Sequence, residues 1–595
     1  MKKFVRIACL VLVVLMSLSV FAACGKGNGG NKGDASGVTD ANFSTADVKY
    51  VAEGGGNVYR IIRAEGAEKI ILSAASSISK VLKTMAGKSP KNTDDTAPAD
   101  ANIPEILIGE TNREETKAAR EYLIQNAGRI GDYVIVTINN KIVIYGMTDE
   151  STVEAATYFK DNYLKAEGVA GGIKYLFTKE GNFLEASING NTKLCRYIIV
   201  RPHYNSAYLT QIEIDRLLAT VEEKTGYRMG QSEDFTVAEH ETEKVQTPVA
   251  EYEIIVGNSM RDGVKKFTDE DQYEVRIEGK KIYLNGGSPY ATAMAVTKFT
   301  DMLVGADRVA VTDSNTATLS WKATEAAYSN EIYYKPTWYD EFNGTEVDTT
   351  KWTIDYENVT GYGRVAVDGK LCKRNRKDPP NSGVKDGILY MNAEQDDEAY
   401  YGGMFYTNGT MRYTYGLLEV SDVHPKGNGF WVAVWTMSDR GPSNLAYTEV
   451  DVDECYGAGT WVYGNTFSWP TSYGNSLGNK SLHVNNRYYS QDGRGFWMDF
   501  HTFGYEWDES TVRFTANGKV YAEQDMQTDE RNIDAFCMPQ FVRLSLSTGS
   551  SEHGLPTQDP EEWANTNSFK VDYCYIYQKD GQLLLINPPA EHVTK

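Results

Sequence analysis

One short stretch of the chain places four carboxylates within six residues, Glu-Val-Asp-Val-Asp-Glu at 449–454. The valines alternate with the first three acids, which is the period of a half-buried strand. A regular strand would therefore carry Glu449, Asp451 and Asp453 on one face and the valines on the other. Like charges along one face repel one another, and a folded chain tolerates that cost mainly where chemistry needs it.

Glu454 stands five positions after Glu449, so a regular strand would turn it to the opposite face. A β-bulge absorbs one residue and would return Glu454 to the acidic face in place of Asp453. Two carboxyl groups on one face suit double-displacement hydrolysis of a glycosidic bond, with one as nucleophile and one as acid/base. A metal site and an ordinary acidic edge strand are the alternatives for these six residues.

The stretch resembles the bulged catalytic strand of laminarinase-like members of glycoside hydrolase family 16. The resemblance covers residues 336–578, with further blocks in the family's order at 338–344, 415–420, 427–435, 500–507, 512–518 and 571–577. Val432 replaces a proline that is usual in the family's tryptophan strand. Asp453 replaces a residue that is usually apolar.

This resemblance implies roles for three acids. Glu449 is expected to be the nucleophile, ionised at neutral pH. Glu454 is expected to be the acid/base, with a pKa raised by the neighbouring negative charges so that it holds a proton for the leaving oxygen. Asp451 lies between them and is expected to orient and electrostatically tune the nucleophile.

Other side chains are candidates for substrate and metal. Trp431 and Trp435 are four positions apart, so on a strand they share a face and are expected to stack on sugar rings, with core packing as the alternative. His501 is expected either near the cleft or as a hydrogen-bonded histidine at a strand end. Many family members bind a structural calcium ion through the aspartate that matches Asp572.

Two further segments are candidates for lying beside the substrate-binding groove. Residues 372–380 are basic, and they form either a solvated insertion or a contact to an anionic sugar. A stretch rich in Gly, Ser and Asn after the acids is expected to be a loop, and it contains Trp461, Trp469 and Tyr473.

Length, charge and cysteine content limit the number of domains and the kinds of partner and site that we expect. A chain of 595 residues is too long for one core and predicts two to four domains. The formal net charge of -21 argues against nucleic acid or anionic lipid as a partner. Of seven cysteines, an odd number remains after the N-terminal segment, without CxxC spacing, so neither a zinc site nor a disulfide framework is indicated.

The N-terminus predicts export. Basic residues precede an apolar run that ends in Ala-Ala-Cys-Gly, so residues 1–24 read as a signal segment. The pattern resembles a bacterial lipobox, which implies lipidation of Cys24 and an outward-facing anchor on the cell membrane. Residues 25–47 are rich in Gly, Asn, Lys, Ser and Asp and are expected to be a flexible tether.

An internal repeat follows the tether. Glu-Ile-Leu-Ile-Gly at 105–109 with Arg113 matches Glu-Ile-Ile-Val-Gly at 253–257 with Arg261. Each copy reads strand, helix, strand, hairpin and helix, which predicts two α/β modules at 48–180 and 181–325. The pattern is similar to the non-catalytic domain ahead of family 20 hexosaminidases and family 67 glucuronidases. The glycine-containing turn that ends at Arg113 lacks the phosphate-loop spacing and is expected to be a strand-end turn.

The expected fold is therefore multidomain. After a linker at 326–335, short aromatic strands with Asn-Gly and Asp-Gly turns predict an antiparallel sandwich at 336–580, followed by a tail at 581–595. The resemblance implies an all-β jelly roll of the concanavalin A-like type, preceded by the two α/β modules.

The expected function is a retaining endo-β-glycanase that needs no cofactor, with β-1,3- or mixed β-1,3/1,4-glucan as the first candidate substrate. Alternatives are a galactan such as agarose, carrageenan or porphyran, or a host glycan. A surface glycan-binding protein with weak turnover is a third reading, and binding by the repeated modules is a fourth. The sequence leaves the oligomeric state open.

Overall fold

The computed structural model describes residues 43–588 apart from 45, 54, 101–102, 166–171, 239–240, 242, 305–316, 321–333, 357–364, 367, 458, 471–481, 491–492, 494, 550–554 and 556–566. Side chains at 317–320 and 482–485 are likewise left undescribed. The signal segment, Cys24, most of the tether, nearly all of the linker and Tyr473 lie outside the described residues. From Phe43 on, the chain forms one compact unit.

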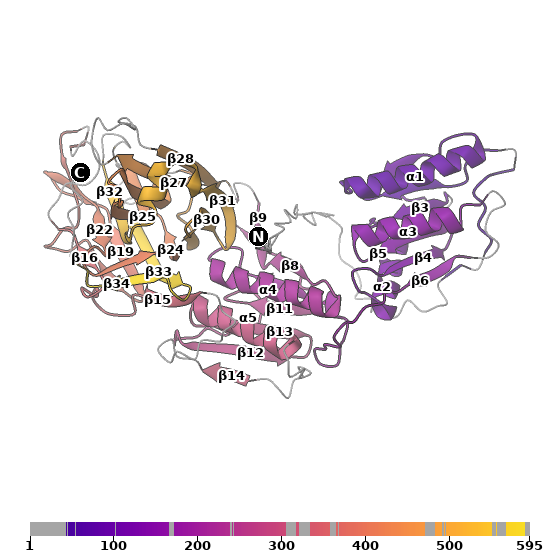
Figure 1. Cartoon of the computed structure of the whole chain (residues 1–595), viewed down its shortest axis with the longest axis horizontal. Helices are drawn as coiled ribbons and strands as arrows, with labels where there is room; N and C mark the ends of the chain where they lie inside the picture. The colour runs from indigo at the N-terminus through magenta and orange to yellow at the C-terminus, as the bar shows by residue number, and fades with distance from the viewer. Residues whose placement is uncertain are drawn as a thin grey trace, which may run out of the picture. The chain divides into compact units, whose positions relative to one another are not determined.

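The first α/β module is built on a six-stranded sheet (Figure 1). Its order is β2 (Asn92–Asp94), β1 (Arg60–Arg63), β3 (Glu105–Ile108), β5 (Lys141–Gly146), β4 (Tyr133–Ile138) and β6 (Lys174–Phe177). The first four strands run parallel, and β4 pairs antiparallel with both β5 and β6. Helices α1 (Lys69–Ala86) and α3 (Asp149–Asn162) pack together, and α2 (Glu114–Asn126) follows β3.

The second module repeats this topology strand for strand. Its order is β8 (Gly230–Glu233), β7 (Ile198–Arg201), β11 (Glu253–Val256), β13 (Lys281–Gly286), β12 (Gln272–Glu278) and β14 (Ala317–Ser320). The parallel and antiparallel pairings fall in the same places. Helices α4 (Tyr208–Thr225) and α5 (Pro289–Val304) take the places of α1 and α3. The predicted repeat is confirmed, and each copy gains an edge strand on both sides that the sequence pattern did not predict.

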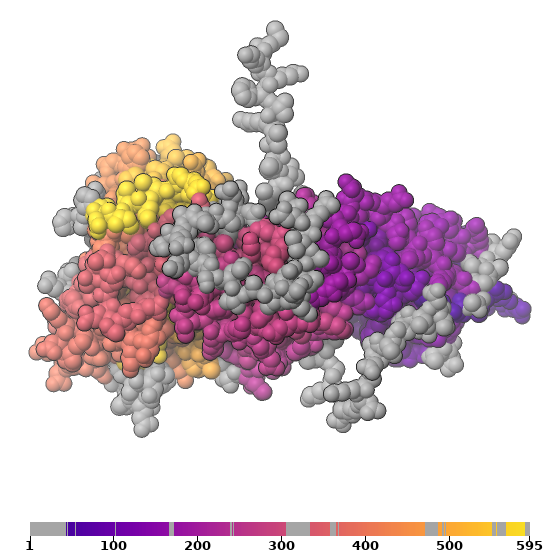
Figure 2. Space-filling model, turned by 90° about the horizontal axis from the view of Figure 1, so that it is seen from below, coloured from indigo at the N-terminus to yellow at the C-terminus, as the bar shows by residue number. Residues whose placement is uncertain are grey.

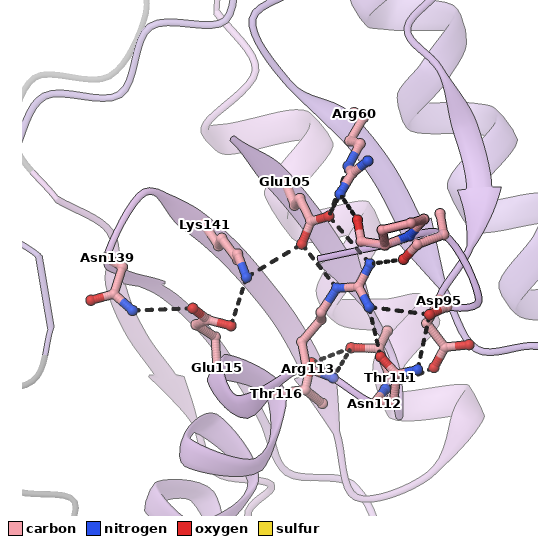
Figure 3. A network of polar contacts seen from close by, with 12 residues as sticks. Arg60, Asp95, Glu105, Thr111, Asn112, Arg113, Glu115, Thr116, Asn139 and Lys141 are labelled. Atoms are coloured by element: carbon pink, nitrogen blue, oxygen red, sulfur yellow. Dashed lines mark hydrogen bonds and ion pairs between the residues drawn. The ribbon is translucent and has the colours of Figure 1, made fainter. Parts of the chain in front are cut away.

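A buried ion network is part of what is repeated. Glu105 is fully buried and accepts from Arg60 and Arg113, with Lys141 also in ion-pair range (Figure 3). In the second module Glu253 pairs with Arg261 at 3.2 Å and Lys281 at 2.8 Å. Because Arg113 holds this network together, the turn after β3 is a structural strand end, as predicted.

The C-terminal domain is an antiparallel sandwich of two large sheets and a small one. The first sheet has the order β18 (Ser382–Lys385), β19 (Ile388–Asn392), β33 (Ser568–Gln578), β24 (Gly416–Val423), β29 (His501–Trp507), β30 (Thr511–Ala516) and β31 (Lys519–Asp525), with β15 (Lys335–Asp340) also on β33. The second has the order β16 (Thr353–Ile354), β22 (Gly403–Tyr406), β32 (Gln540–Thr548), β25 (Phe430–Arg440), β26 (Ala446–Tyr456), β27 (Trp461–Pro470) and β28 (Leu482–Tyr489). Strands β17 (Leu371–Lys373), β21 (Ala399–Tyr401) and β20 (Glu394–Gln395) form the small sheet.

Two parts of this domain differ from what the sequence predicts. Part of the predicted tail forms β34 (Leu583–Ile586), which pairs with β23 (Met411–Thr414) in the second sheet, so these residues belong to the sandwich. In Figure 2 the last described residues, drawn in yellow, lie on the surface of this domain. Trp461 and Trp469, expected in a loop, lie in strand β27. A short helix, α6 (Glu530–Ala535), packs on β26 and β27.

The two large sheets close around one apolar core. Alternate residues of β24, β25, β26 and β32 point into it, among them Val420, Val434, Val450 and Leu544. The other face of the second sheet carries the polar and aromatic residues described next.

Candidate active site

The acidic stretch lies in β26, between β25 and β27, and it contains a bulge. Val434 of β25 pairs with Asp453, while the next residue, Trp435, pairs with Asp451. On the other side Asp451 pairs with Asn465 and Glu454 with Tyr463, so β26 has one extra residue on this side as well. The predicted bulge is confirmed.

The bulge decides which acids share a face. Glu449, Asp451 and Glu454 stand opposite Met437, Trp435 and Ala433 of β25 on the face turned away from the core. Asp453 points into the core instead, where His424 Nε2 lies 2.7 Å from its Oδ2. The regular-strand expectation for Asp453 is thus corrected, because the extra residue moves Glu454 into its place.

Each of the three acids of this face accepts a hydrogen bond from a neutral N–H donor. Asn465 Nδ2 donates to Glu454 Oε2 at 2.9 Å and to Asp451 Oδ2 at 3.3 Å. Trp431 Nε1 donates to Glu454 Oε1 at 3.1 Å. At the other end Trp469 Nε1 donates to Glu449 Oε2 at 3.2 Å.

Burial and mutual repulsion favour protonated acids here. Burial raises the pKa of Asp451 well above its ordinary value, and the charges of Glu454 and Glu449 add to that shift. Burial also raises the pKa of Glu454, although donors from Tyr456, Trp431 and Asn465 pull it back. The predicted direction for Glu454 is confirmed, but the main cause is burial rather than neighbouring charge.

The register of the sheet shows which residues of neighbouring strands lie beside these acids. A row of directly opposed residues runs across five strands: Tyr406, Arg543, Trp435, Asp451 and Asn465. Opposed residues in neighbouring strands point to the same face. This row therefore places an arginine and a tryptophan on the side of the site next to Asp451.

The two tryptophans predicted to share a face do share it, since both are partly exposed and contact groups on the acid side. Besides its bond to Glu454, Trp431 packs near Tyr456. Trp435 Nε1 donates to Ser545 Oγ at 3.1 Å, and the guanidinium of Arg543 lies 4.4 Å from its ring centroid. Their stacking on a sugar stays a prediction.

Two predicted residues are not brought to this group. His501 lies in β29 of the first sheet, buried against Phe496, with its Nδ1 3.0 Å from Asn517 Nδ2. That matches the alternative of a hydrogen-bonded histidine at a strand end. Asp572 lies in β33 of the same first sheet, where burial raises its pKa to about 6.

Within the described parts of the chain, one group of three or more His, Cys, Asp or Glu has ligand atoms close enough to hold a metal ion. It consists of Asp422, His424 and Asp453 in the core, and it does not include Asp572. Calcium binding at Asp572 stays a prediction. Cys455, the residue after Glu454, has a free thiol buried in the core.

Sequence reasoning missed two residues of this site. Asn465 reaches the acids from β27, and Arg543 reaches the row from β32. Trp469, which was predicted in a segment that bears on the groove, donates to Glu449 from β27. Nothing local marks Asn465 or Arg543, because strand register brings them into place.

Comparisons with known proteins match the part of the chain that contains this site. Residues 375–575 match the family model described as glycosyl hydrolases family 16. This part of the chain is a family 16 glycoside hydrolase domain.

Curated relatives match the same region. Glucan endo-1,3-beta-glucosidase A1 of Niallia circulans is 24% identical over 277 residues, which is 41% of this chain and 37% of that protein. Beta-glucanase of Rhodothermus marinus is 26% identical over 263 residues, 41% of this chain and 86% of the relative. A solved laminarinase catalytic domain from Thermotoga maritima is 25% identical, covering 41% of this chain and 98% of that one, with a TM-score of 0.34. The chain spans little more than a third of the first relative.

Proposed function

We propose that the family 16 domain is a retaining endo-β-glycanase, which hydrolyses internal O-glycosidic bonds of a polysaccharide by double displacement. The observation that carries this proposal is the bulge in β26, which puts Glu454 on the face of Glu449 and Asp451. A pair of carboxyl groups on one open face is what this reaction needs.

In the first step Glu449 attacks the anomeric carbon and forms a glycosyl-enzyme ester. The N–H of Trp469 holds one oxygen of this carboxylate, which directs the other toward the sugar. Glu454 gives its proton to the leaving oxygen, and its raised pKa keeps that proton available. Glu454 then takes a proton from the water that hydrolyses the ester.

Asp451 works beside the nucleophile. Burial and the neighbouring charges raise its pKa, which favours the protonated form and so shields Glu449 from a second negative charge. Asn465 bonds both Asp451 and Glu454, so it sets the spacing between the tuning acid and the acid/base.

The first candidate substrate is β-1,3- or mixed β-1,3/1,4-glucan. It is supported by the names of the relatives, which are glucanases and glucan endo-glucosidases. The second candidate is a galactan or a host glycan that carries charge, and the arginine beside Trp435 favours it. One matched structure comes from work on endo-acting O-glycanases that begin mucin breakdown.

The test uses the full mature chain on laminarin, lichenan, agarose, carrageenan and porphyran, next to Glu449→Gln. We expect new reducing ends with at least one polymer and their loss, by roughly 10³-fold or more, in the variant. Proton NMR of the first product should show the β-anomer before mutarotation. Equal activity of the variant, or an α-anomer first, would overturn the proposal. Polymer binding without turnover would favour the glycan-binding reading.

We further propose that the protein is exported and anchored to the outer face of the cell membrane through lipidated Cys24. The composition of residues 1–47 supports this. No helix within the described residues is long and apolar enough to cross a membrane. Cys24→Ala should release the protein from the membrane fraction into the medium, and continued membrane association of that variant would contradict the anchor.

A further inference from the structure

Arg543 is an unusual residue for the floor of this site. It lies in β32, directly opposite Tyr406 on one side and Trp435 on the other. Along β32 only Arg543 and Ser547 are partly exposed, and the rest of the strand is buried. Its guanidinium lies 4.4 Å from the ring centroid of Trp435 and 5.0 Å from that of Phe541. The side chain thus packs against aromatic rings on the face that carries the acids.

This guanidinium has no carboxylate in direct contact. Among the residues that the structure describes, none comes within 4.0 Å of it, although Glu449 and Asp355 lie near enough to attract it, and its buried Nε has no hydrogen-bond partner. Burial, together with the charge of Arg374, lowers its pKa to about 10. Burying a charge without a partner is costly, so such a residue is retained where something outside the chain pairs with it.

Arg374 adds a second positive charge to the same place. It forms an ion pair with Asp355, and it lies near enough to affect the pKa of both Arg543 and Tyr406. Asp355 is fixed in turn, because Asn375 donates to its carbonyl from both backbone and side chain. Arg374 therefore has a direct carboxylate partner, whereas Asp355 and Glu449 attract Arg543 only from beyond ion-pair distance.

The rest of the basic loop does not contribute in this way. Arg376 pairs with Glu394 and lies over the ring of Tyr401. Lys377 is exposed and lies over Tyr356. Only Arg374 of this loop joins Arg543, so the positive charge is a local feature of one end of the site.

We propose that Arg543, assisted by Arg374, binds a negatively charged substituent of the polysaccharide, a sulfate ester or a carboxylate, on a sugar next to the one attacked by Glu449. This inference rests on the proposed function and narrows its substrate to charged glycans. Guanidinium groups match the oxygen spacing of both anions and bind them through paired N–H bonds. Trp435 and Phe541 hold the guanidinium plane in place, so little of its freedom is lost on binding.

The experiment compares polymers that share a backbone and differ in charge. Laminarin is paired with sulfated laminarin and with laminarin carboxylated at C6, and agarose is paired with porphyran. We expect the wild-type chain to prefer the charged member of a pair in kcat/KM. In Arg543→Gln the ratio of kcat/KM on the charged member to kcat/KM on the neutral member should fall by roughly 10- to 100-fold. The sulfated and carboxylated arms show which anion is bound.

Two control variants sharpen the result. Arg543→Lys keeps the charge but loses the planar fork, so it should retain only part of the preference. Arg228→Gln removes an exposed arginine of the second module and should leave the preference unchanged. Raising the salt concentration should lower the wild-type preference and have no effect on Arg543→Gln.

Three outcomes would overturn the inference. One is equal cleavage of charged and neutral members by the wild-type chain. Another is an equal loss on both members in Arg543→Gln, which would make Arg543 a structural or hydroxyl-binding residue. If no polymer is cleaved, the proposed function fails, and binding of the Glu449→Gln chain to the same pairs is measured by calorimetry. Charged members bound no more tightly than neutral ones would then refute the anionic site separately.

Discussion

The acids on the two faces of strand β26 have different kinds of hydrogen-bond partner. On the open face, Asp451 and Glu454 receive hydrogen bonds from neutral donors, Asn465 and Trp431. On the core face, Asp453 and Asp422 share the imidazole of His424, at 2.7 Å and 3.3 Å. Neutral donors contact the acids of the open face, whereas the core carboxyls contact an imidazole whose pKa they raise.

The pKa directions follow that contrast. Burial alone would lower the pKa of His424, but the charges of Asp453 and Asp422 raise it well above its ordinary value. Burial and then Asp453 raise the pKa of Asp422 to about 8. The core group is thus held together by the contacts of its imidazole with both carboxyls. Although they are adjacent in the chain, Asp453 belongs to the core group and Glu454 belongs to the proposed catalytic acids.

The largest expected effect is on the open face. Glu454→Gln removes the proton donor, so turnover of a polysaccharide should fall by roughly 10³-fold or more. An aryl β-glycoside whose leaving group needs no proton should lose much less in the first step, measured as the burst of released phenol. Glu398→Gln, an exposed glutamate of the same domain, is the matched control. An equal loss on both substrates would contradict the acid/base role.

The next effect concerns the core face. Asp453→Leu leaves His424 and Asp422 buried without their shared carboxylate, and we expect a loss of about 3–5 kcal/mol in the free energy of unfolding. Replacing all three residues together with apolar ones of similar size should restore most of that loss. Urea unfolding followed by tryptophan fluorescence measures both. A cost below about 1 kcal/mol for the single change would show that the core group is not a coupled unit.

A smaller effect is expected at the link between the acids. Asn465→Ala removes a donor that favours the ionised form of Glu454, so the pKa of Glu454 should rise further. The alkaline limb of the pH profile of kcat/KM should shift to higher pH, with a fall of roughly tenfold at the optimum. The shift in the limb is the decisive readout, since damage to folding alone would lower activity without moving it.

The last expected effect is on the pH dependence of stability. Asp422 binds a proton in the folded state up to about pH 8, while in the unfolded chain it is ionised above about pH 4. Its contribution to stability is therefore present at low pH and is lost as the pH rises toward 8, by at most about 1.4 kcal/mol per pH unit. Asp422→Asn should flatten this dependence in urea unfolding at pH 5, 6, 7 and 8. An unchanged slope would show that Asp422 titrates normally.

Much of the architecture could be predicted from local patterns. The repeat was visible because matching strand and helix periods recur, and the buried residues of α1 and α4 lie at helical spacing. The edge strands β2 and β8 were missed because their residues, Asn-Thr-Asp and Gly-Gln-Ser-Glu, are polar and show no alternation. An edge strand is held by backbone hydrogen bonds to its neighbour, and these leave little trace in composition.

The sequence alone determined that the acids at 449–454 form a strand and that a bulge is needed to bring Glu454 to the side of Glu449. Spacing carries that information, because side chains of a strand alternate with a period of two. Only the tertiary structure decided what surrounds them: Asn465 and Trp469 from β27, Arg543 from β32, and His424 from the segment after β24. Strand register brings these residues together across long separations in the chain, and no local pattern encodes register between distant strands.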